Sequence, residues 1–489
     1  MKLGSLLKDM EITVWHGDLS CEIKGIAYDS RKVKPGYLFV CIKGFKTDGH
    51  LFAQSAVDNG AVAILGETKL DLIGNVTQVI IPDCRQALPI LAARFYGQPS
   101  RDLRIIGVTG TNGKTTTTHF IRAILEEWGK RTAIMGTLYA KIDDYQHELG
   151  HTTPESLEIE EFFAITRQKK GEYVVMEVSS HALDLNRVDE ILFDVAVFTN
   201  LTQDHLDYHQ TMEKYKQAKL KLFRKIPEGS KNFVIINSDD ESARDFINAA
   251  SSRVCTYGID NPADVRATGV NTNLKGTSFN VEYGGEVLSI RMKPIGLFSV
   301  YNALAAIAFA LQEGIAPAII KQALEKVEGV PGRFEQVDCG QDFTVIVDYA
   351  HTPDGLQNIL ATARKLVENR LITVFGCGGD RDRSKRPLMG EIAATYSDFC
   401  IITSDNPRSE DPLAIINEIV PGVDRVKDSR YSIIADRREA IRHAIFLARP
   451  GDLIIIAGKG HETYQLVKDQ VLDFDDRKIA AEFLKGKGV

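Results

Sequence analysis

Short apolar segments alternate with longer helical segments over most of the chain, and this alternation restricts the possible folds more than any other feature. From residue 103 onward, segments such as LRIIGVTG, EYVVMEVS and VAVFTN are each followed by stretches with the composition of helices. Strands that are apolar throughout are expected to be buried on both faces, which is typical of parallel sheets covered by helices. The sequence therefore predicts an α/β protein with doubly wound parallel sheets.

Chain length and two linker-like segments divide this pattern into predicted domains. A chain of 489 residues is too long for one hydrophobic core. The segments GQPSRDLR and EGVPGRFE have the Gly, Pro and Ser content of linkers and are also candidate hinges. We therefore expect three α/β domains, over residues 1–98, 99–329 and 330–489.

Charge and cysteine usage argue against several classes of protein. A formal net charge of −7 disfavours a nucleic-acid-binding protein, whereas a small anionic substrate needs only one local basic pocket. The seven cysteines are scattered and none is in CxxC spacing, so we expect neither a disulfide framework nor a structural zinc site. There is no apolar run long enough for a signal peptide or a membrane span. We expect a cytoplasmic monomer.

The segment VTGTNGKTTTT has the order of a phosphate-binding loop, because it follows an apolar strand and opens a helix. Gly110 and Gly113 would let backbone N–H groups approach phosphates, Lys114 could reach the terminal phosphates, and the Thr115 hydroxyl could ligate Mg²⁺. The strict pattern GxxxxGK[ST] would need glycine at position 108, where the chain has Val108. The segment predicts an ATP or GTP site, with an ordinary strand–helix turn as the alternative.

Two further predicted strands end in polar groups. The segment VVMEVSSHALD carries Glu177 and His181, and TNLTQDHLDYH carries Asn200, Asp204 and His205. One such acid or histidine is more often structural than functional. Two of these strand ends together with a phosphate loop favour a hard divalent cation with oxygen-rich ligands.

The segment SDNPRSEDP follows another apolar strand and allows two interpretations. Asp405, Asn406 and Pro407 are turn-forming residues, so the segment could be a surface turn. Alternatively, the planar guanidinium of Arg408 could bind a ligand carboxylate at the end of the strand. Both interpretations can hold if the turn serves to present Arg408.

A set of motifs together resembles the Mur ligase family over essentially the whole chain: TGTNGKTTT, MEVSSHALD, TNLTQDHLDYH, YKQAK, VYNALAA, PGRFE and DYAHTPDGL. Within the family, YDSRKVKPGYLFVCIKG, HTTP, GCGGDRDRSKRP, SDNPRSEDP and GKGHE resemble the members that add 2,6-diaminopimelate. The resemblance implies an ATP-dependent, ADP-forming amide ligase of peptidoglycan precursor synthesis, and hence a role in cell-wall biogenesis, cell shape and cell division. It would join meso-2,6-diaminopimelate to UDP-N-acetylmuramoyl-L-alanyl-D-glutamate through an acyl phosphate.

The resemblance also implies roles for individual residues in the central domain. The ATP site would comprise Gly110, Thr111, Asn112, Gly113, Lys114, Thr115, Thr116, Asn302, Arg333 and Asp348. Mg²⁺ would be held by Thr115, Glu177 and His205. Lys219 in YKQAK matches the lysine that family members carry as a carbamate (N6-carboxylysine), whereas its plainest reading is a helix-surface cation near phosphates. Lys114, Lys219 and His205 would be the catalytic residues.

The resemblance implies an N-terminal α/β domain over residues 1–98 that binds the UDP end of the substrate, a central P-loop ATPase-like domain over 99–329, and a Rossmann-like C-terminal domain over 330–489 that binds the amino acid. The implied contacts of the UDP-muramoyl dipeptide are Ser30, Phe45, Lys46, Thr47, Thr152, Thr153, Ser179 and Arg187. The implied contacts of diaminopimelate are Arg381, Asp405, Asn406, Pro407, Arg408, Gly458 and Glu462. Two positions depart from the family pattern: Ser299 stands where many relatives have Asn, and Leu185 stands where some have Gln.

Three alternative functions are weighed against this prediction. A Mur ligase that adds L-lysine would lack the arginine at position 408. A ligase of the folylpolyglutamate synthase type shares the central motif, but the N-terminal block and the DNPR segment speak against it. A non-catalytic nucleotide-binding regulatory protein would not be expected to keep Lys114, Glu177, His205 and Lys219 together.

Overall fold

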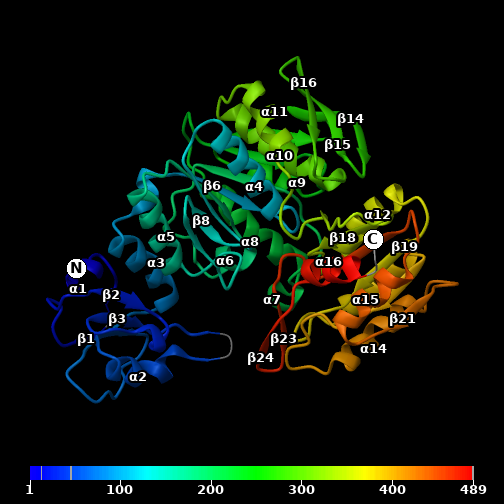
Figure 1. Ribbon diagram of the computed structural model, residues 1–489. Coiled ribbons are helices and arrows are strands. Elements are labelled where there is room, and N and C mark those ends of the chain that lie inside the picture. Colours follow the sequence, from blue (N-terminus) through cyan, green and yellow to red (C-terminus); the bar gives the residue numbers. More distant parts are fainter. Residues whose placement is uncertain (13, 45–46, 487–489) are drawn as a thin grey trace. The chain divides into compact units, whose positions relative to one another are not determined.

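The computed structural model of the protein describes residues 1–12, 14–44 and 47–486 (Figure 1). The chain forms two compact units. The first unit comprises Met1–Thr109, Gly129–Ala196 and Lys221–Asn232, and the second comprises Gly110–Trp128, Val197–Leu220 and Phe233–Val489. Both contain parallel β-strands and α-helices, so the predicted α/β class is confirmed. The domain boundaries after residues 98 and 329 stay predictions.

The N-terminal part of the first unit is a five-stranded sheet with helices on both faces. The strand order is β1-β5-β4-β3-β2, and only the edge strand β1 is antiparallel. The bounds of the strands are β1 (Val14–His16), β2 (Gly25–Ala27), β3 (Tyr37–Val40), β4 (Ala61–Gly66) and β5 (Thr77–Ile80). Leu38 and Val40 share a core with α3, whereas Phe39 shares another with α2, because successive side chains of a strand point to opposite faces.

The helices of this part are α1 (Leu3–Leu6), α2 (Ala53–Asp58) and α3 (Cys84–Phe95), with 3₁₀ helices η1 (Ser30–Lys32), η2 (Gly49–Phe52) and η3 (Pro99–Asp102). Helix α3 begins after Asp83, whose carboxylate accepts hydrogen bonds from the backbone N–H groups of Arg85 and Gln86. Such a cap satisfies donors that a helix start leaves without intrahelical partners. The start of α3 is therefore fixed by a capping aspartate.

The rest of the first unit contains parallel strands that are buried along most of their length. The strand order is β6-β10-β7-β8-β9, in which β6, β10 and β7 are parallel and β8 and β9 are antiparallel additions. The elements are β6 (Arg104–Thr109), β7 (Thr132–Met135), β8 (Ala140–Ile142), β9 (Tyr145–His147), α5 (Ser156–Gln168), β10 (Tyr173–Glu177) and α6 (Ser180–Asp184). In the register of β6 and β10, Glu177 lies opposite Val108. Glu177 therefore lies at the carboxyl end of the parallel strands.

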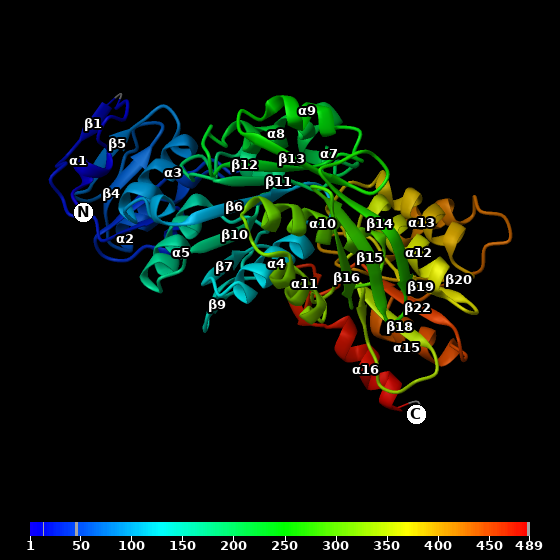
Figure 2. The same cartoon turned by 90° about the horizontal axis from the view of Figure 1, so that it is seen from above.

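In the second unit, β12 and β13 are parallel and lead into an antiparallel extension (Figure 2). The strands are β11 (Val195–Phe198), β12 (Phe233–Asn237), β13 (Arg253–Gly258), β14 (Val265–Asn273), β15 (Gly276–Tyr283) and β16 (Glu286–Met292). The sequence analysis did not predict the extension β14–β16. These strands alternate buried and exposed positions along part of their length, as expected for a sheet with one face in solvent.

The helices before the C-terminal part of the second unit are α4 (Lys114–Glu127), α7 (Leu206–His209), α8 (Met212–Arg224), α9 (Ala243–Ala249), α10 (Leu297–Gln312) and α11 (Pro317–Lys326). Helix α10 is almost entirely apolar and is buried over most of its length, where it packs against α4. Helix α4 begins at the phosphate loop. The packing of α10 against α4 therefore supports the helix that starts at this loop.

The C-terminal part of the second unit is a six-stranded sheet in the order β17-β18-β22-β19-β20-β21, parallel except for β17. The strands are β17 (Glu335–Gln336), β18 (Thr344–Asp348), β19 (Leu371–Phe375), β20 (Phe399–Ile402), β21 (Tyr431–Ile433) and β22 (Leu453–Ala457). A two-stranded hairpin, β23 (Tyr464–Val467) and β24 (Gln470–Asp473), follows. The helices are α12 (Pro353–Leu366), α13 (Lys385–Tyr396), α14 (Pro412–Val423), α15 (Arg437–Leu447) and α16 (Asp476–Gly486).

Two cores cover the faces of this sheet. One contains apolar side chains of α12, α13 and α14, and the other contains those of α15 and α16. The predicted doubly wound arrangement is confirmed here. In such sheets ligands bind outside the carboxyl ends of the strands. The loops after β18, β19, β20 and β22 are therefore the places to look for a binding site.

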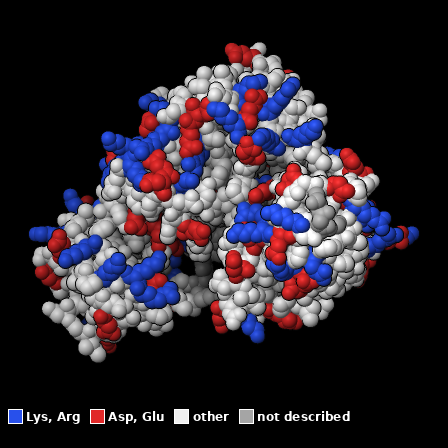
Figure 3. All heavy atoms as spheres, in the orientation of Figure 1, with Lys and Arg blue, Asp and Glu red and all other residues white. Residues whose placement is uncertain are grey.

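The surface carries both signs of charge. On the face shown in Figure 3, Lys and Arg side chains are interspersed with Asp and Glu side chains. This mixture agrees with the modest net charge of −7. In the part of the chain that the structure describes, no helix is both long enough and apolar enough to cross a bilayer.

Candidate active site

The loop between β6 and α4 is held by residues that follow β11. The backbone N–H of Thr111 donates to the carbonyl of Asn200 (2.8 Å), and the N–H of Asn112 donates to its side-chain oxygen (2.9 Å). The Thr199 hydroxyl in turn donates to the Asn112 carbonyl (2.7 Å). The loop conformation is therefore fixed by hydrogen bonds within the second unit.

Glycine is required at the last position of this loop. Gly113 has φ +87°, and a Cβ there would lie 2.3 Å from Oδ1 of Asn302. The next residue, Lys114, donates from Nζ to the carbonyls of Gly110 (2.9 Å) and Thr111 (2.8 Å). The lysine ammonium is thus folded over the loop. Backbone carbonyls therefore hold the Lys114 ammonium by hydrogen bonds at the loop where phosphates are predicted to bind.

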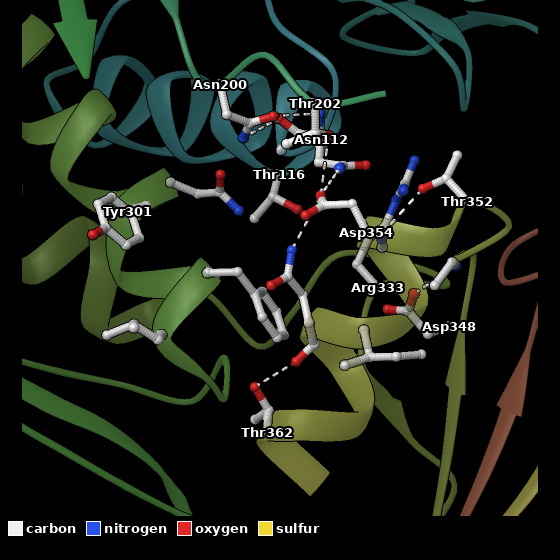
Figure 4. A pocket seen from close by; sticks show the side chains of 18 of the residues that line it. Asn112, Thr116, Asn200, Thr202, Tyr301, Arg333, Asp348, Thr352, Asp354 and Thr362 are labelled. Atoms are coloured by element: carbon white, nitrogen blue, oxygen red, sulfur yellow. Dashed lines mark hydrogen bonds between the residues drawn. The ribbon is translucent and has the colours of Figure 1, made fainter. Parts of the chain in front are cut away.

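A pocket of about 410 Å³ opens beside this loop (Figure 4). It is lined by side chains from α10, from the segment around Arg333 and from the start of α12. The predicted nucleotide-binding residues in its wall are Asn112, Gly113, Thr115, Thr116, Asn302, Arg333 and Asp348. The structure therefore brings these residues together, although they are far apart in the sequence.

Arg333 and Asp348 form the side of the pocket opposite the loop. An Nη atom of Arg333 donates to the Thr115 hydroxyl (2.9 Å), and its guanidinium lies over the Tyr349 ring. The Nε of Arg333 is buried and has no hydrogen-bond partner among the described residues. Asp348 is buried and accepts from the N–H groups of Phe334 (2.6 Å) and Ala350 (2.7 Å). Burial raises the pKa of Asp348, while the charge of Arg333 opposes that rise.

Asp354 contacts the loop, although the sequence analysis gave it no role. Its carboxylate accepts from the Asn112 amide (2.6 Å), the Thr202 hydroxyl (3.2 Å) and the Asn358 amide (3.2 Å). Figure 4 shows Asn112, Thr202 and Asp354 pointing toward one another. Burial raises the pKa of Asp354. Asp354 stands in the motif DYAHTPDGL, and this motif could have indicated its role from the sequence. It joins the first turn of α12 to the phosphate loop.

Lys219 lies inside the protein rather than on a helix surface. It is 1% exposed, its Nζ donates to the Gly110 carbonyl (2.8 Å), and its ammonium lies 4.5 Å from the centroid of the Tyr215 ring. Burial lowers its pKa well below the ordinary value for lysine, and the charge of Lys114 acts in the same direction. The surface-cation alternative is therefore wrong, and the site favours an uncharged amine at this position.

His205 begins α7 with φ +55°, and its Nε2 lies 3.4 Å from the carboxylate of Asp204. Thr115 and His205 belong to the second unit and Glu177 to the first. Among the described residues, no three His, Cys, Asp or Glu side chains form a group that could hold a metal ion by themselves. The use of Thr115, Glu177 and His205 as Mg²⁺ ligands stays a prediction.

In the first unit, several predicted substrate residues surround the end of β10. Glu177 accepts from the N–H (2.8 Å) and the hydroxyl (3.0 Å) of Thr137. The Thr153 hydroxyl donates to the Glu177 carbonyl (2.9 Å) and accepts from the Ser179 N–H (3.0 Å). Arg187 donates to the Thr153 carbonyl (2.9 Å). Thr153, Ser179 and Arg187 are therefore in one hydrogen-bonded cluster.

Thr152 is linked to the same cluster through the hydroxyl of Thr137, at 3.1 Å. Ser30 is buried at the start of η1, where its carbonyl accepts from the Asn59 amide (3.0 Å). Among the described contacts, none joins Ser30 or Thr47 to this cluster. Phe45 and Lys46 lie outside the described residues.

The segment SDNPRSEDP is a largely buried loop at the carboxyl end of β20. Asp405 and Asn406 are each 5% exposed. Arg408 has φ +52°, its backbone N–H donates to the Leu466 carbonyl (3.0 Å), and its carbonyl accepts from the Lys468 N–H (2.6 Å). The loop is thus tied to the hairpin β23–β24 by backbone hydrogen bonds. The reading as a simple surface turn is wrong for Asp405 and Asn406.

The side chains of Arg408 and Arg381 meet beside Gly378. A Cβ on Gly378 would lie 3.0 Å from an Nη atom of Arg408 and 3.8 Å from Cγ of Arg381. Among the described residues, the Arg408 guanidinium donates a single hydrogen bond, to the Gly379 carbonyl (2.7 Å). Burial lowers the pKa of Arg408, and the charge of Arg381 acts in the same direction. Two neighbouring arginines, one of them half-buried, are the kind of group that can bind an anion, and this use of them stays a prediction.

Acidic and amide groups lie next to this cationic pair. A Cβ on Gly458 (φ +119°) would lie 2.6 Å from the Asp405 carboxylate, so only glycine permits this close approach. The Glu462 carboxylate accepts from the Asn406 amide (2.9 Å). Lys459 joins them: its Nζ donates to Asn406 Oδ1 (3.0 Å) and Glu462 Oε2 (3.0 Å). The sequence analysis missed Lys459, although it stands inside GKGHE.

The loops after β19, β20 and β22 therefore bring a second set of predicted residues together. These are Arg381, Asp405, Asn406, Pro407, Arg408, Gly458 and Glu462. The three strands are neighbours in the sheet, so their carboxyl ends meet at one edge. Pro407 contributes through its backbone, since its carbonyl lies against Gly379.

Two fully buried arginines form hydrogen bonds with these loops and with the ends of the strands that precede them. Arg386 makes two hydrogen bonds with the Glu410 carboxylate (2.8 and 3.0 Å) and another with Glu418 (2.8 Å), which ties the loop after β19 to the loop after β20. Arg437 pairs with the buried Asp476 (2.7 Å) and donates to the Ala457 carbonyl (3.0 Å). Neither arginine was predicted as part of the site, because burial of a charged residue cannot be read from its neighbours in the sequence.

Replacing Asp476 with asparagine is expected to destabilise the protein by about 3–5 kcal/mol, because it leaves the buried Arg437 without its counter-charge. Urea unfolding monitored by circular dichroism would measure the change. The matched control is Glu482→Gln, which breaks the exposed ion pair with Arg438 between the same two helices. That change should alter stability by less than about 1 kcal/mol. Equal effects of both substitutions would contradict the assigned role of Arg437.

Comparisons with known proteins agree with this arrangement. The Mur ligase family, catalytic domain, matches residues 22–96; the Mur ligase middle domain matches 108–310; and the Mur ligase, glutamate ligase domain, matches 332–460. A UDP-N-acetylmuramoyl-L-alanyl-D-glutamate–2,6-diaminopimelate ligase of Syntrophomonas wolfei is 65% identical over 487 residues, which is 100% of both chains. The ligase of the same name from Caldanaerobacter subterraneus is 48% identical and covers 99% of both chains.

Solved structures show the same likeness. A structure of UDP-N-acetylmuramoyl-L-alanyl-D-glutamate–2,6-diaminopimelate ligase has a TM-score of 0.69 and 34% identity, and the match covers 100% of this chain and 99% of that one. Mycobacterium tuberculosis folylpolyglutamate synthase, complexed with ADP and AMPPCP, has a TM-score of 0.64 and 19% identity over 76% of this chain and 92% of its own. That second match shows a shared fold only. The chain belongs to the Mur ligase family.

Proposed function

We propose that the chain is an ATP-dependent, ADP-forming ligase that joins meso-2,6-diaminopimelate to UDP-N-acetylmuramoyl-L-alanyl-D-glutamate, in peptidoglycan precursor synthesis. The relatives with high identity over the full length carry the name of this activity. The observation that carries the proposal is the arrangement of Arg408 and Arg381 beside Asp405 and Glu462. This arrangement suits an amino-acid end that has both a carboxylate and an ammonium group.

The chemistry of the pocket distinguishes diaminopimelate from L-lysine. Both carry an ammonium group at the far end, but only diaminopimelate has a second carboxylate there. Arg408 keeps free donors of its planar guanidinium, which can bind a carboxylate in two-pronged geometry. A buried polar site built for a charged partner rejects the analogue that lacks it by about 10⁴-fold. We therefore propose strong discrimination against L-lysine.

The reaction would proceed in two steps. The substrate carboxylate attacks the γ-phosphorus of ATP and forms an acyl phosphate with release of ADP; the amine then attacks the acyl carbon, and phosphate leaves. Both partners of the first step are anionic, so it requires charge neutralisation and alignment. Arg333 in the wall of the pocket and Lys114 over the adjacent loop would supply positive charge, and the buried Nε of Arg333 leaves a donor for an anion.

Mg²⁺ would be held by the Thr115 hydroxyl, the Glu177 carboxylate and His205. The oxygen donors in this set suit a hard cation. When bound, Mg²⁺ would neutralise phosphate charge. The residues in the wall of the pocket, including Asn302 and Asp348, would position the nucleotide.

We also propose that Lys219 is carbamylated. In this reaction the uncharged ε-amine adds to the carbon of CO₂, and the proton lost from nitrogen goes to solvent, which leaves an N-carboxylate. Burial and the adjacent Lys114 favour the uncharged amine that the reaction needs. The product would place an anion next to the phosphate loop.

For the other substrate, we propose that the cluster of Thr152, Thr153, Ser179 and Arg187 binds the muramoyl peptide. Its hydroxyl and guanidinium donors suit the carboxylates of a peptide. Ser30, Phe45, Lys46 and Thr47 would bind the uridine diphosphate end. In this assignment residues 1–98 bind the UDP substrate, 99–329 bind ATP and 330–489 bind the amino acid.

Phosphate release from ATP tests the proposed function. We expect release only when UDP-muramoyl dipeptide and meso-diaminopimelate are both present, because the acyl phosphate requires one and its resolution requires the other. L-Lysine in place of diaminopimelate should give about 10⁴-fold lower turnover per unit concentration. Substrate-independent release would indicate a plain nucleotidase. Release that required a folate and glutamate would instead support the folylpolyglutamate synthase alternative.

A further inference from the structure

Lys459 is a buried cation that the proposed reaction does not use directly. It follows Gly458 at the carboxyl end of β22 and is 0% exposed. Its Nζ donates to Asn406 Oδ1 (3.0 Å) and to Glu462 Oε2 (3.0 Å), and it lies 3.8 Å from Oδ1 of Asp405. All of these partners were predicted to contact the amino acid. Lys459 itself faces the protein.

Lys459 is one of the groups that hold the Asn406 amide. Asn406 Oδ1 accepts from Lys459 and from the Leu466 N–H (2.9 Å), while its Nδ2 donates to Glu462 (2.9 Å). The Leu466 N–H and the Glu462 carboxylate already distinguish the amide oxygen from the NH₂ group. Without the ammonium, Asn406 Oδ1 and Glu462 Oε2 would lose the cation that they share, and both side chains would be held less firmly.

Lys459 also balances two carboxylates that share a small buried volume. Burial raises the pKa of Glu462, the charge of Lys459 opposes that rise, and Asp405 adds to it. The Asp405 carbonyl is held as well, because the Gln465 amide donates to it (2.6 Å). Two buried carboxylates without a cation between them would tend to share a proton.

We propose that Lys459 is a positioning residue of the amino-acid site, which keeps Glu462 charged and holds Asp405 and Asn406 in the orientation that receives the ammonium group of the incoming amino acid. This inference rests on the proposed function. Lys459 acts through its three partners and does not touch the substrate. Removal of the Lys459 side chain should therefore weaken the binding of one substrate, the amino acid, rather than slow the reaction itself.

The charged and titratable groups around this site decide the sign of the pH effect. They are Asp405, Glu462, Arg408, Arg437, Tyr349, Tyr464 and His351. Removing the Lys459 cation leaves the other groups in place and takes away one influence that lowers the pKa of Glu462. The carboxylate would then form only at higher pH. The acidic limb of kcat/KM for the amino acid should move to higher pH.

The test uses full-length Lys459→Met with ATP and UDP-muramoyl dipeptide at saturation. We expect KM for meso-diaminopimelate to rise at least about tenfold, because a hydrogen bond to a charged group is lost, with a smaller change in kcat. KM for ATP should stay at the wild-type value. The acidic limb of kcat/KM for meso-diaminopimelate should move to higher pH. Lys478→Met, which removes an exposed lysine of α16, is the matched control and should match wild type in each respect.

Lys459→Gln, which keeps a donor but no charge, is the second variant in case Lys459→Met does not fold. Circular dichroism establishes that each variant is folded. An unchanged KM and an unchanged acidic limb in a folded variant would overturn the inference. Equal losses toward all three substrates with the wild-type pH profile would also overturn it, because they indicate a purely structural role. A wild-type protein that forms no product with diaminopimelate would overturn the proposed function instead.

Discussion

Arg408→Ala is expected to lower kcat/KM for meso-diaminopimelate by about 10²- to 10³-fold, the range for removing one member of a buried charged pair. The guanidinium lies half-buried beside Arg381 and donates, within the described residues, only to the Gly379 carbonyl. Its loss would leave the far carboxylate of the substrate without its proposed partner. Steady-state kinetics at varied diaminopimelate concentration would measure the change.

The same variant should also lose most of its discrimination against L-lysine, because the group that requires the second carboxylate is gone. Arg442→Ala is the matched control, since Arg442 is exposed and pairs only with Glu439 on its own helix. It should leave both activities at the wild-type level. If Arg408→Ala kept the wild-type preference for diaminopimelate, the assignment of the amino acid to this pocket would be wrong.

Lys219→Ala should lower kcat by at least about 10²-fold, and short carboxylic acids such as formate or acetate should restore part of the activity. The loss is of the size found when one preorganised electrostatic group is removed from an active site. Rescue is expected because a free carboxylate can occupy the space of the proposed N-carboxylate. Because Lys219 is buried beside Gly110, the space left by its side chain would be enclosed by the protein.

The matched control for this prediction is Lys214→Ala on the same helix. Lys214 is exposed and donates to the Gln210 side chain, so its removal should change kcat little and carboxylic acids should have no effect on it. Rescue by formate that increases with formate concentration in Lys219→Ala alone would support the carbamate. Full activity of Lys219→Ala without any added acid would contradict it.

Much of the fold was predictable because it depends on local patterns. Strands that are apolar over most of their length, such as Tyr173–Glu177 and Leu453–Ala457, indicate burial on both faces, and the structure places both in parallel sheets. The antiparallel strands β14–β16 were missed. Their partners are fixed by pairing between strands, as between Val265 and Tyr283, and a pattern of apolar runs does not reveal that pairing.

The residues of the candidate site also differ in whether the sequence alone reveals their roles. Lys114 and Arg408 could be selected from the sequence because each stands in a motif after an apolar strand, where ligand-binding loops occur. Arg437 could not, and Asp354 and Lys459 were missed although each stands in a motif, because their roles depend on neighbours far away in the sequence. Asp354 reaches Asn112 and Arg437 reaches Asp476, and only folding brings these pairs together.

The sequence by itself determined the α/β class, the phosphate loop and the arginine that points to a second carboxylate, because each is written in a short run of residues. Only the tertiary structure decided the state of the charged groups: that Lys219 is buried beside Gly110, and that Lys459 lies between Asn406 and Glu462. The physical reason is desolvation. The charge of a lysine or carboxylate depends on how much water and which opposite charges surround it, and those surroundings are assembled from distant segments.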